Sequence, residues 1–238
     1  MPKVNQKKKP IDVFKDHGVL FSTEGHESEG ECPFCDRENK FIVKDTGQYH
    51  CVVCEEGGNH IGFVKRLWEL SLQLTKKSDY EGIAEDRGPF IPAFKKWGLA
   101  KSIISGEWIM PGFNGDGKMS QLYRRSGKTQ FPTSTLGQGI LNAHNIDPKR
   151  NTLYVLEGFW DGCAWQQAIG LNENVIALPG ANVFKDNWIK IFSGKDVVLL
   201  FDSDYQGTSR RTGQPTDCLL YTSPSPRDLS TSRMPSSA

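Results

Sequence analysis

The chain has 238 residues, enough for one medium domain or two small ones, and a hydrophobic share of 37% with 11% aromatic residues is typical of a globular protein with a real core. No run approaches the roughly 18 apolar residues that a membrane span needs, and the lysine-rich start lacks the apolar segment of a secretory signal, so we expect a cytoplasmic protein without membrane contact. The formal net charge of +1 does not by itself indicate a nucleic-acid-binding protein, so any such surface has to be local.

The first segment, residues 1–27, is expected to be an N-terminal tail. Its one marked feature is the basic run Lys7, Lys8 and Lys9. An arm that contacts nucleic acid and a solvated, disordered tail both fit this run. The tail is favoured, because charged runs at a chain end usually face water.

Four cysteines form two closely spaced pairs. They are Cys32-Pro-Phe-Cys35 and Cys51-Val-Val-Cys54, with fifteen residues between the pairs. Each pair turns two sulfurs toward one point, and four thiolates are typical of tetrahedral Zn²⁺. A redox site of the thioredoxin type is the main rival, but two such pairs so close together favour zinc. Because four protein ligands leave no open position for water, we expect the zinc ion to be structural.

A hairpin is expected between the two cysteine pairs. Residues 40–44 and 48–50 are typical of short strands, and Asp-Thr-Gly at 45–47 is typical of a turn. His50 and His60 lie near the second pair, and either could replace a sulfur. A polar or template-facing histidine beside a complete four-cysteine site is the favoured interpretation for both.

The next segment has helical spacing. Apolar residues recur through 61–74 at the intervals of one helix face, which indicates core packing rather than a ligand site; they are Ile61, Val64, Leu67, Trp68 and Leu72. Residues 75–87 are charged and carry little pattern, so they are the candidate linker.

A second hairpin is predicted farther along the chain. Residues 107–111 and 118–125 flank Asn-Gly-Asp-Gly at 114–117, a strong turn signal. The hairpin ends in Arg124 and Arg125, with Lys128 close by. Such a group of cations suits nucleotide or template phosphates, and it equally suits a solvated edge strand that uses charge against aggregation.

Three short apolar runs then follow at regular spacing. Residues 153–156, 175–178 and 197–201 are expected to be strands, and the gaps between them have helical character. Alternation of strands and helices favours a parallel sheet. The first intervening helix is expected to carry Cys163 as a small buried filler, and to pack through an apolar face made of Trp160, Ala164, Trp165, Ala168 and Ile169.

Carboxylates follow two of these strands. Glu157 comes directly after the first strand, and Asp202 and Asp204 come directly after the third. Because ligands gather at the carboxyl ends of parallel strands, these three acids are expected to lie together. Their mutual repulsion would need a divalent cation, and Mg²⁺ prefers a few carboxylates together with water and substrate phosphate.

The cysteine region resembles a known zinc-binding domain. The run Tyr49-His50-Cys51, followed by Cys54 and then by Gly58-Asn59 and Phe63-Val64, resembles that of bacterial DnaG-type and phage primases. Those proteins often carry a histidine where Cys35 stands, and this chain has the all-cysteine form. Residues 86–99 also resemble the helical element that opens the polymerase region in phage primases. The resemblance implies a zinc-ribbon DNA-binding domain at 28–75, and a linker with the first part of a primase core at 76–150.

The acidic region resembles the TOPRIM domain of DnaG-type primases, topoisomerases and some nucleases. The residues that carry the resemblance are Leu156-Glu157-Gly158-Phe-Trp-Asp161, Leu178-Pro-Gly180 and Phe201-Asp202-Ser-Asp204 with Gly207. Asp161 matches a further family acid, although a carboxylate at a helix start could also simply favour the helix dipole. The implied fold class is α+β with α/β: a zinc ribbon, then a mixed RNA-polymerase subdomain, then an incomplete parallel-sheet TOPRIM core at 151–217.

The resemblance implies a primase that makes short RNA primers on single-stranded DNA in phage or plasmid replication inside a bacterial host. Structural Zn²⁺ would support the ribbon, and Glu157, Asp202 and Asp204 would hold catalytic Mg²⁺ or Mn²⁺. Asp161 would assist this catalytic site. The expected partners are single-stranded DNA, ribonucleoside triphosphates and a replicative helicase, fused or separate. His60 and the cations of the second hairpin would contact nucleic acid or nucleotide.

Two other functions remain open. One is another TOPRIM enzyme, a nuclease or topoisomerase, although a topoisomerase needs a tyrosine nucleophile in a separate domain. The other is a non-catalytic, zinc-dependent DNA-binding module. Zinc ribbon first and TOPRIM second is the order that favours primase.

The last segment, 218–238, departs from everything before it. It is rich in Ser and Pro and has no strand or helix period. It resembles the conceptual translation of a transposase-library sequencing adapter, and a genuine Ser/Pro-rich linker is the alternative. We therefore expect native sequence to stop near Asp217, and the chain as written to bind zinc but to be inactive as a polymerase.

Overall fold

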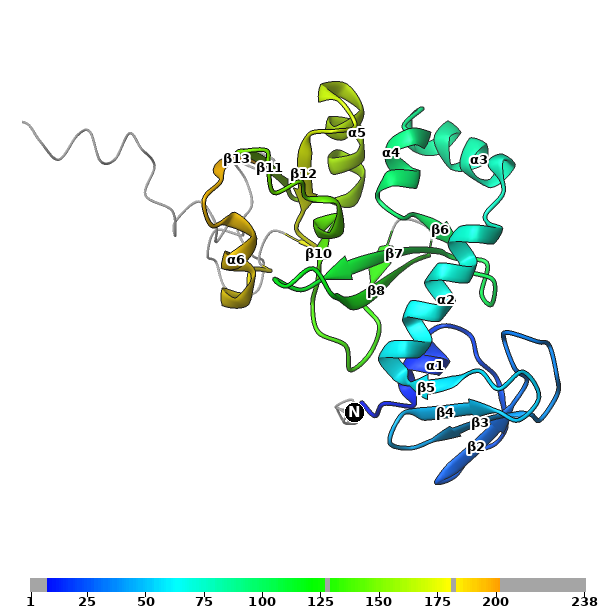
Figure 1. Cartoon of the computed structure of the whole chain (residues 1–238). Coiled ribbons are helices and arrows are strands. Elements are labelled where there is room, and N and C mark those ends of the chain that lie inside the picture. The colour runs from blue at the N-terminus through cyan, green and yellow to red at the C-terminus, as the bar shows by residue number, and fades with distance from the viewer. Residues whose placement is uncertain (1–7, 127–128, 181–182, 202–238) are drawn as a thin grey trace, which may run out of the picture.

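The structure, a computed structural model, describes residues 8–126, 129–180 and 183–201 (Figure 1). Its first part is a five-stranded antiparallel sheet in the order β1-β2-β3-β4-β5. The strands are β1 (Phe21–Thr23), β2 (Glu27–Gly30), β3 (Phe41–Lys44), β4 (Gln48–Cys51) and β5 (Gly57–Asn59). The predicted hairpin is therefore present as β3 and β4, inside a larger sheet than the sequence indicated.

The turn between β3 and β4 depends on a glycine. Gly47 has φ +83°, and a Cβ at this position would lie 2.6 Å from Pro10 and 2.7 Å from the His60 ring. Any other residue would be strained in backbone and crowded at the side chain. The turn thus brings the start of the chain and the start of the following helix against the same point of the ribbon.

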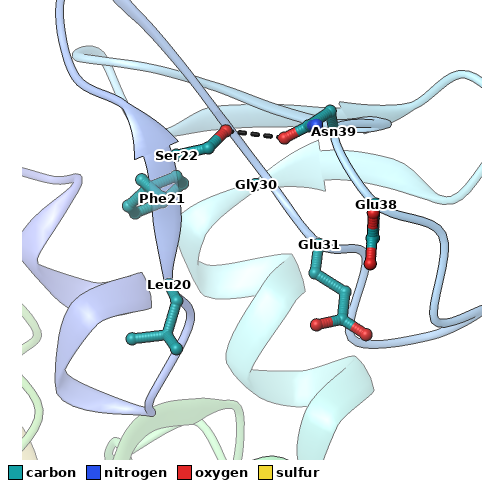
Figure 2. A pocket seen from close by; sticks show the side chains of 7 residues that line it. All are labelled: Leu20, Phe21, Ser22, Gly30, Glu31, Glu38 and Asn39. Carbon is teal, nitrogen blue, oxygen red and sulfur yellow. Dashed lines mark hydrogen bonds between the residues drawn. The ribbon is translucent and has the colours of Figure 1, made fainter.

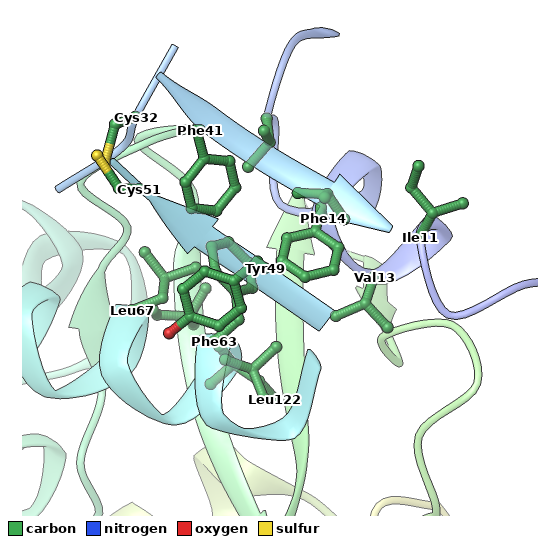
Figure 3. Close-up of a cluster of buried hydrophobic side chains, with 14 of the residues drawn as sticks. Ile11, Val13, Phe14, Cys32, Phe41, Tyr49, Cys51, Phe63, Leu67 and Leu122 are labelled. Atoms are coloured by element: carbon green, nitrogen blue, oxygen red, sulfur yellow. The ribbon is translucent and has the colours of Figure 1, made fainter. Parts of the chain in front are cut away.

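From residue 8 onward, the segment expected to be a tail is folded. Within it, helix α1 (Asp12–Asp16) buries Val13 and Phe14 completely. The ring centroid of Phe14 lies 4.5 Å from that of Phe63 and 5.8 Å from that of Tyr49 (Figure 3). The sequence prediction was wrong here, because the apolar pair is too short to reveal a helix without the ribbon on which it packs. Lys7 lies outside the described residues.

Helix α2 (His60–Leu74) confirms the predicted helix, but its buried face includes Phe63, and Ile61 of the predicted stripe is 45% exposed. The Asn59 side chain caps it by accepting a hydrogen bond from the Gly62 amide at 2.8 Å. Its buried face contains Phe63 and Leu67, which belong to one hydrophobic cluster with Leu122 of the second sheet (Figure 3). The ribbon and one part of the second sheet therefore share a core.

The candidate linker is a helix. Helix α3 (Lys77–Arg87) begins where the Asp79 carboxylate accepts a hydrogen bond from the Lys76 amide at 3.0 Å. Tyr80 is buried, and its hydroxyl donates to the Leu99 carbonyl at 2.7 Å. Tyr80 is the only buried side chain of α3. The helix therefore depends on the tertiary contact of Tyr80, and the weak apolar pattern of the sequence could not predict it. A short helix, α4 (Ile91–Lys96), follows.

A second, eight-stranded sheet lies beyond these helices. Its order is β13-β11-β12-β10-β7-β8-β9, and β6 pairs with β7. The strands are β6 (Ala100–Lys101), β7 (Trp108–Phe113), β8 (Met119–Ser126), β9 (Thr129–Phe131), β10 (Ile140–Leu141), β11 (Thr152–Leu156), β12 (Asn174–Ala177) and β13 (Asp196–Leu200). The predicted hairpin is confirmed, because β7 and β8 are antiparallel neighbours joined across 114–117.

One half of this sheet is parallel. Strand β11 pairs in parallel with β12 on one side and with β13 on the other, so the three predicted apolar runs are strands that lie side by side. The remaining strands pair antiparallel, which makes the whole sheet mixed. Short helical elements connect the strands: 3-10 turns η1 (Ala143–Asn145) and η2 (Asp186–Trp188), and helix α6 (Ile189–Phe192).

Helix α5 (Phe159–Ile169) connects β11 to β12, as expected, but its buried face differs from the predicted one. Cys163 is buried, as predicted. Phe159 and Gly162 are also buried, whereas Ala168 of the predicted face is exposed. A Cβ on Gly162 would lie 2.0 Å from the indole of Trp97, so the absence of a side chain lets this ring lie against the helix. The sequence could not indicate this contact, because Trp97 lies at the C-terminal end of α4, distant in the chain from Gly162. None of the described helices is long and apolar enough to cross a bilayer.

A buried histidine joins the end of α1 to the second sheet. His17 is fully buried, and its Nε2 lies 2.8 Å from Thr133 Oγ1. Because the Thr133 hydroxyl donates to the Leu122 carbonyl, the imidazole is the donor in this contact. Burial, followed by the nearby Arg124, lowers the pKa of His17 to about 3, although Asp16 opposes the shift. The ring is therefore neutral near pH 7.

We expect acid to destabilise the protein through His17. The folded state keeps the ring neutral, while the unfolded chain takes up a proton below a pH of about 6.5, so the free energy of unfolding should fall by about 1 kcal/mol between pH 7 and 5.5. Urea unfolding of the wild type and of His17→Gln, with zinc in excess, measures this contribution. The variant should be less stable at pH 7 but lose less stability over the interval. Equal losses in both proteins would assign the acid sensitivity to other groups.

Candidate functional site

The four cysteines lie together at one end of the ribbon. All four Sγ atoms are within 4.8 Å of one another. The Sγ atoms of Cys32 and Cys54 are 3.8 Å apart, and those of Cys35 and Cys51 are 3.7 Å apart. A tetrahedral zinc ion with Zn–S bonds of about 2.3 Å needs sulfurs about 3.8 Å from one another. The thiols are therefore already spaced for this ion.

The two cysteine pairs have the same backbone geometry. In the first, the Asp36 amide donates to the Cys32 carbonyl at 2.9 Å, and in the second the Glu55 amide donates to the Cys51 carbonyl at 3.0 Å. The residue after each pair is left-handed, with φ +56° at Asp36 and +58° at Glu55. This repeated turn aims both sulfurs of each pair at one point. The sequence spacing predicted the convergence, whereas the left-handed residues, neither of them glycine, carried no signal.

The thiols differ in burial. Cys32 and Cys51 are fully buried, and Cys54 is exposed. Burial is the largest influence on Cys51 and raises its pKa, but hydrogen bonds from the backbone of Cys54 and Val53 and from neighbouring thiols together lower that pKa to about 7. Since zinc is held by thiolates, binding should release protons, with Cys51 well placed to ionise first.

Neither of the nearby histidines, His50 and His60, belongs to the group of metal-ligand candidates. Among the described residues, these four cysteines form the only group of three or more His, Cys, Asp or Glu side chains close enough together to hold a metal ion. His50 is exposed, and the His60 ring packs against the Gly47 turn. Burial lowers the pKa of His60. The favoured prediction of a complete four-cysteine site therefore agrees with the geometry, while the template-facing role of His60 stays a prediction.

A shallow depression lies beside the first cysteine pair. It has a volume of about 250 Å³, and the Ser22 hydroxyl donates across it to Asn39 Oδ1 at 2.6 Å (Figure 2). Two carboxylates, Glu31 and Glu38, lie at its edge (Figure 2). Their charge makes this hollow unsuited to a phosphate.

The paired arginines of β8 point in opposite directions, as alternation along a strand requires. Arg124 faces the ribbon, where its guanidinium lies 3.5 Å from Asp16 and 3.4 Å from Glu107. The Asp16 carboxylate also accepts a hydrogen bond from the Ser134 amide at 2.6 Å. The charge of Arg124 is thus already matched by two carboxylates that bridge the ribbon and the second sheet.

Arg125 faces helix α5. Its guanidinium carbon lies 4.7 Å from the ring centroid of Trp160, and that of Arg87 lies 5.3 Å from the same ring. The sequence placed Arg124 and Arg125 in a single cluster and gave no weight to Arg87. A helix end and a strand end that are 38 residues apart in the chain meet here, which only the tertiary structure reveals. Lys128 lies outside the described residues.

Two of the predicted acids, Glu157 and Asp161, lie in the part of the chain that the structure describes. Glu157 directly follows β11 and is partly exposed, and Asp161 lies in the first turn of α5. Leu156 lies opposite Leu200 in the parallel register, so the chain leaves β11 and β13 at the same edge of the sheet. Asp202, Asp204 and Gly207, and the tail at 218–238, lie outside the described residues. Their grouping with Glu157 stays a prediction.

We expect removal of one sulfur to empty the zinc site. Cys54→Ser keeps the fold of the exposed loop but loses a thiolate, and should weaken zinc binding by roughly a hundredfold or more. Metal analysis and competition with a chromophoric chelator measure the affinity. Cys163→Ala is the matched control, since Cys163 is buried in α5, away from the four sulfurs. A wild-type protein that purifies without zinc, or a Cys54→Ser protein that retains it, would contradict the assignment.

Three comparisons place these features among known proteins. Residues 1–80 match the family model of the CHC2 zinc finger, the zinc ribbon of DnaG. No curated protein matches the sequence. Among solved structures, the primase fragment of the bacteriophage T7 primase-helicase protein is 18% identical with a TM-score of 0.45, and the match covers 74% of this chain and 80% of that one.

Two further solved structures are similar at the same level. The Aquifex aeolicus primase, with its zinc-binding and RNA polymerase domains, is 15% identical with a TM-score of 0.42, over 83% of this chain and 70% of that one. The DnaG primase catalytic domain bound to single-stranded DNA is 14% identical with a TM-score of 0.46, over 64% and 63%. The four converging sulfurs and the family match lead to one conclusion: the N-terminal third of this chain is a zinc ribbon of the DnaG primase type.

Proposed function

We propose that this chain is a DNA primase, which synthesises short RNA primers on a single-stranded DNA template by metal-dependent nucleotidyl transfer. The observation that carries the proposal is the combination of a DnaG-type zinc ribbon with a mixed sheet that shares its core. The parallel half of that sheet ends in Glu157, and its sequence continues from β13 into Asp-Ser-Asp at 202–204. This order of domains along the chain suits an enzyme that binds both template and nucleotides.

In this proposal the parts divide the work. The ribbon selects a single-stranded DNA site, and its zinc ion is structural. Glu157, Asp202 and Asp204 hold Mg²⁺ or Mn²⁺, with Asp161 nearby, as in the TOPRIM domain that the sequence resembles. When bound, such ions neutralise triphosphate charge and stabilise in-line phosphoryl transfer. Arg125 and, beyond the described residues, Lys128 bind phosphates.

The cellular setting is part of the same proposal. The all-cysteine form of the ribbon resembles that of phage primases, so we propose a role in phage or plasmid replication. There the chain would act with a replicative helicase, either fused or separate. The T7 structure belongs to a primase-helicase protein, and that arrangement is a property of the T7 protein.

Two alternatives differ in what they require. Another TOPRIM enzyme, a nuclease or topoisomerase-like protein, would use the same acids on a different substrate. A non-catalytic DNA-binding module would need only the ribbon. The match of the ribbon to the DnaG family favours a primase over another TOPRIM enzyme. A Mg²⁺ or Mn²⁺ site at Glu157, Asp202 and Asp204 would distinguish a primase from a non-catalytic DNA-binding module.

We expect the acids after β11 and β13 to bind a divalent cation, Mg²⁺ or Mn²⁺. Glu157→Gln or Asp202→Asn should weaken Mn²⁺ binding at least tenfold, measured by electron paramagnetic resonance. In the product of the complete gene, the same change should reduce ribonucleotide incorporation on single-stranded DNA by about a hundredfold or more. Asp196→Asn is the matched control, because this exposed carboxylate lies at the opposite end of β13. If the product of the complete gene makes no oligonucleotide and Asp202→Asn binds Mn²⁺ as tightly as the wild type, the primase proposal fails.

Substitution of the two arginines of β8 should affect different properties, binding affinity for Arg125 and stability for Arg124. Arg125→Gln should lower affinity for single-stranded DNA or nucleotide and, if its phosphate belongs to DNA, reduce the salt slope by about one. Arg124→Gln should mainly lower stability, by about 1 kcal/mol, because its partly buried ion pairs join the ribbon to the sheet. Filter binding at several salt concentrations and urea unfolding measure both effects. Equal losses of affinity in the two variants would assign phosphate contacts to both residues.

A further inference from the structure

Two cationic side chains converge on one indole. Trp160 lies in the first turn of α5, three residues after Glu157. The guanidinium carbon of Arg125, from the end of β8, is 4.7 Å from the ring centroid, and that of Arg87, the last residue of α3, is 5.3 Å from it. Both distances are within the range in which an aromatic face attracts a cation. Three elements far apart in sequence thus meet at this ring, beside a proposed catalytic acid.

The indole is itself held in place by other aromatic rings. The Phe94 ring lies 5.5 Å from that of Trp160 at an interplanar angle of 88°, and the Phe159 ring lies 5.1 Å away at 81°. These are edge-to-face contacts, which favour one orientation of each ring. Phe94 and Phe159 are fully buried. Trp160 is therefore a rigid platform rather than a mobile surface side chain.

The charges at this platform do not balance. Arg87 pairs with Asp86 at 2.9 Å. Arg125 is only 8% exposed, and among the described residues no carboxylate lies within ion-pair distance of it. Burial, followed by the neighbouring Arg87, lowers the pKa of Arg125, although Asp86 opposes the shift. The indole face helps to offset the cost of burying this cation. Among the described residues the guanidinium of Arg125 makes no hydrogen bond, so its donors can bind an anion.

We propose that Trp160 is a positioning residue that holds the guanidiniums of Arg125 and Arg87 beside Glu157, where phosphate groups of substrate bind. The inference rests on the proposed function, and adds a residue that acts through the two arginines rather than by touching the reacting atoms. An indole suits this task better than an aliphatic side chain, because its face attracts cations while its body fills the space between α5 and α4. Without it, the buried charges would repel each other and move apart.

The first test replaces the ring. Trp160→Leu should weaken binding of single-stranded DNA, of ribonucleoside triphosphate with Mn²⁺, or of both, by roughly three- to tenfold. The probe affected should be the one that Arg125→Gln affects, which tells whether the phosphate belongs to template or nucleotide. Trp160→Phe should recover part of the loss. Trp165→Leu is the matched control, since Trp165 lies on the same helix and packs against Tyr154 instead.

The second test keeps the shape and changes only the charge distribution of the ring. Tryptophans carrying one, two and four fluorine atoms, placed at position 160 alone by nonsense suppression, should weaken binding in proportion to the loss of negative charge on the ring face. A purely structural ring would give no such gradient. Thermal unfolding of each variant checks that the fold is retained, so the fluorinated series decides even if Trp160→Leu fails to fold.

The outcomes are distinct. If Arg125→Gln weakens binding while the fluorinated series is flat, or while Trp165→Leu weakens binding as much as Trp160→Leu, the positioning role is wrong and the proposed function stands. If Arg125→Gln leaves both probes bound as tightly as the wild type, the phosphate role of Arg125 and the role of Trp160 fail together. A graded fluorine series with a silent Trp165→Leu supports the proposal.

Discussion

The ring of Phe63, at the start of α2, is the contact on which the rest of the structure depends. Its centroid lies 4.5 Å from Phe14 of α1, 5.7 Å from Tyr49 of β4 and 5.8 Å from Phe34 of the first cysteine pair. Aromatic rings bury large areas and favour defined mutual angles, so this group specifies orientation as well as stability. Because α2 continues from Phe63 into contact with the second sheet, the ribbon, the zinc site and the sheet are oriented as one body (Figure 1).

That shared core gives β8 its particular role. One face of the strand meets the ribbon, where Arg124 is enclosed by carboxylates, and the other meets α5, where Arg125 lies on an indole. The same side-chain chemistry therefore serves two purposes at adjacent positions. The difference arises from the pleat of the strand alone, because successive side chains point to opposite faces.

Much of the architecture follows from local pattern. The cysteine pairs, the turn at 114–117 and the three apolar runs of the parallel sheet each carry a strong local signal, and each has the predicted form in the structure. Predictions failed where a segment's signal is weak and its partner is distant. Helix α1 needs the ribbon, and α3 needs Leu99 to accept the hydrogen bond of Tyr80.

The sequence by itself therefore determined the zinc ligands, the two hairpins and the three parallel strands, because spacing and hydrophobic period are local properties. Only the tertiary structure decided which cations face one another, which ring they share and how the ribbon lies on the sheet. Arg87, Arg125 and Trp160 have no common motif, and their meeting depends on how α3, β8 and α5 pack. Contacts of this kind come from the sum of many weak packing energies, which no short stretch of sequence encodes.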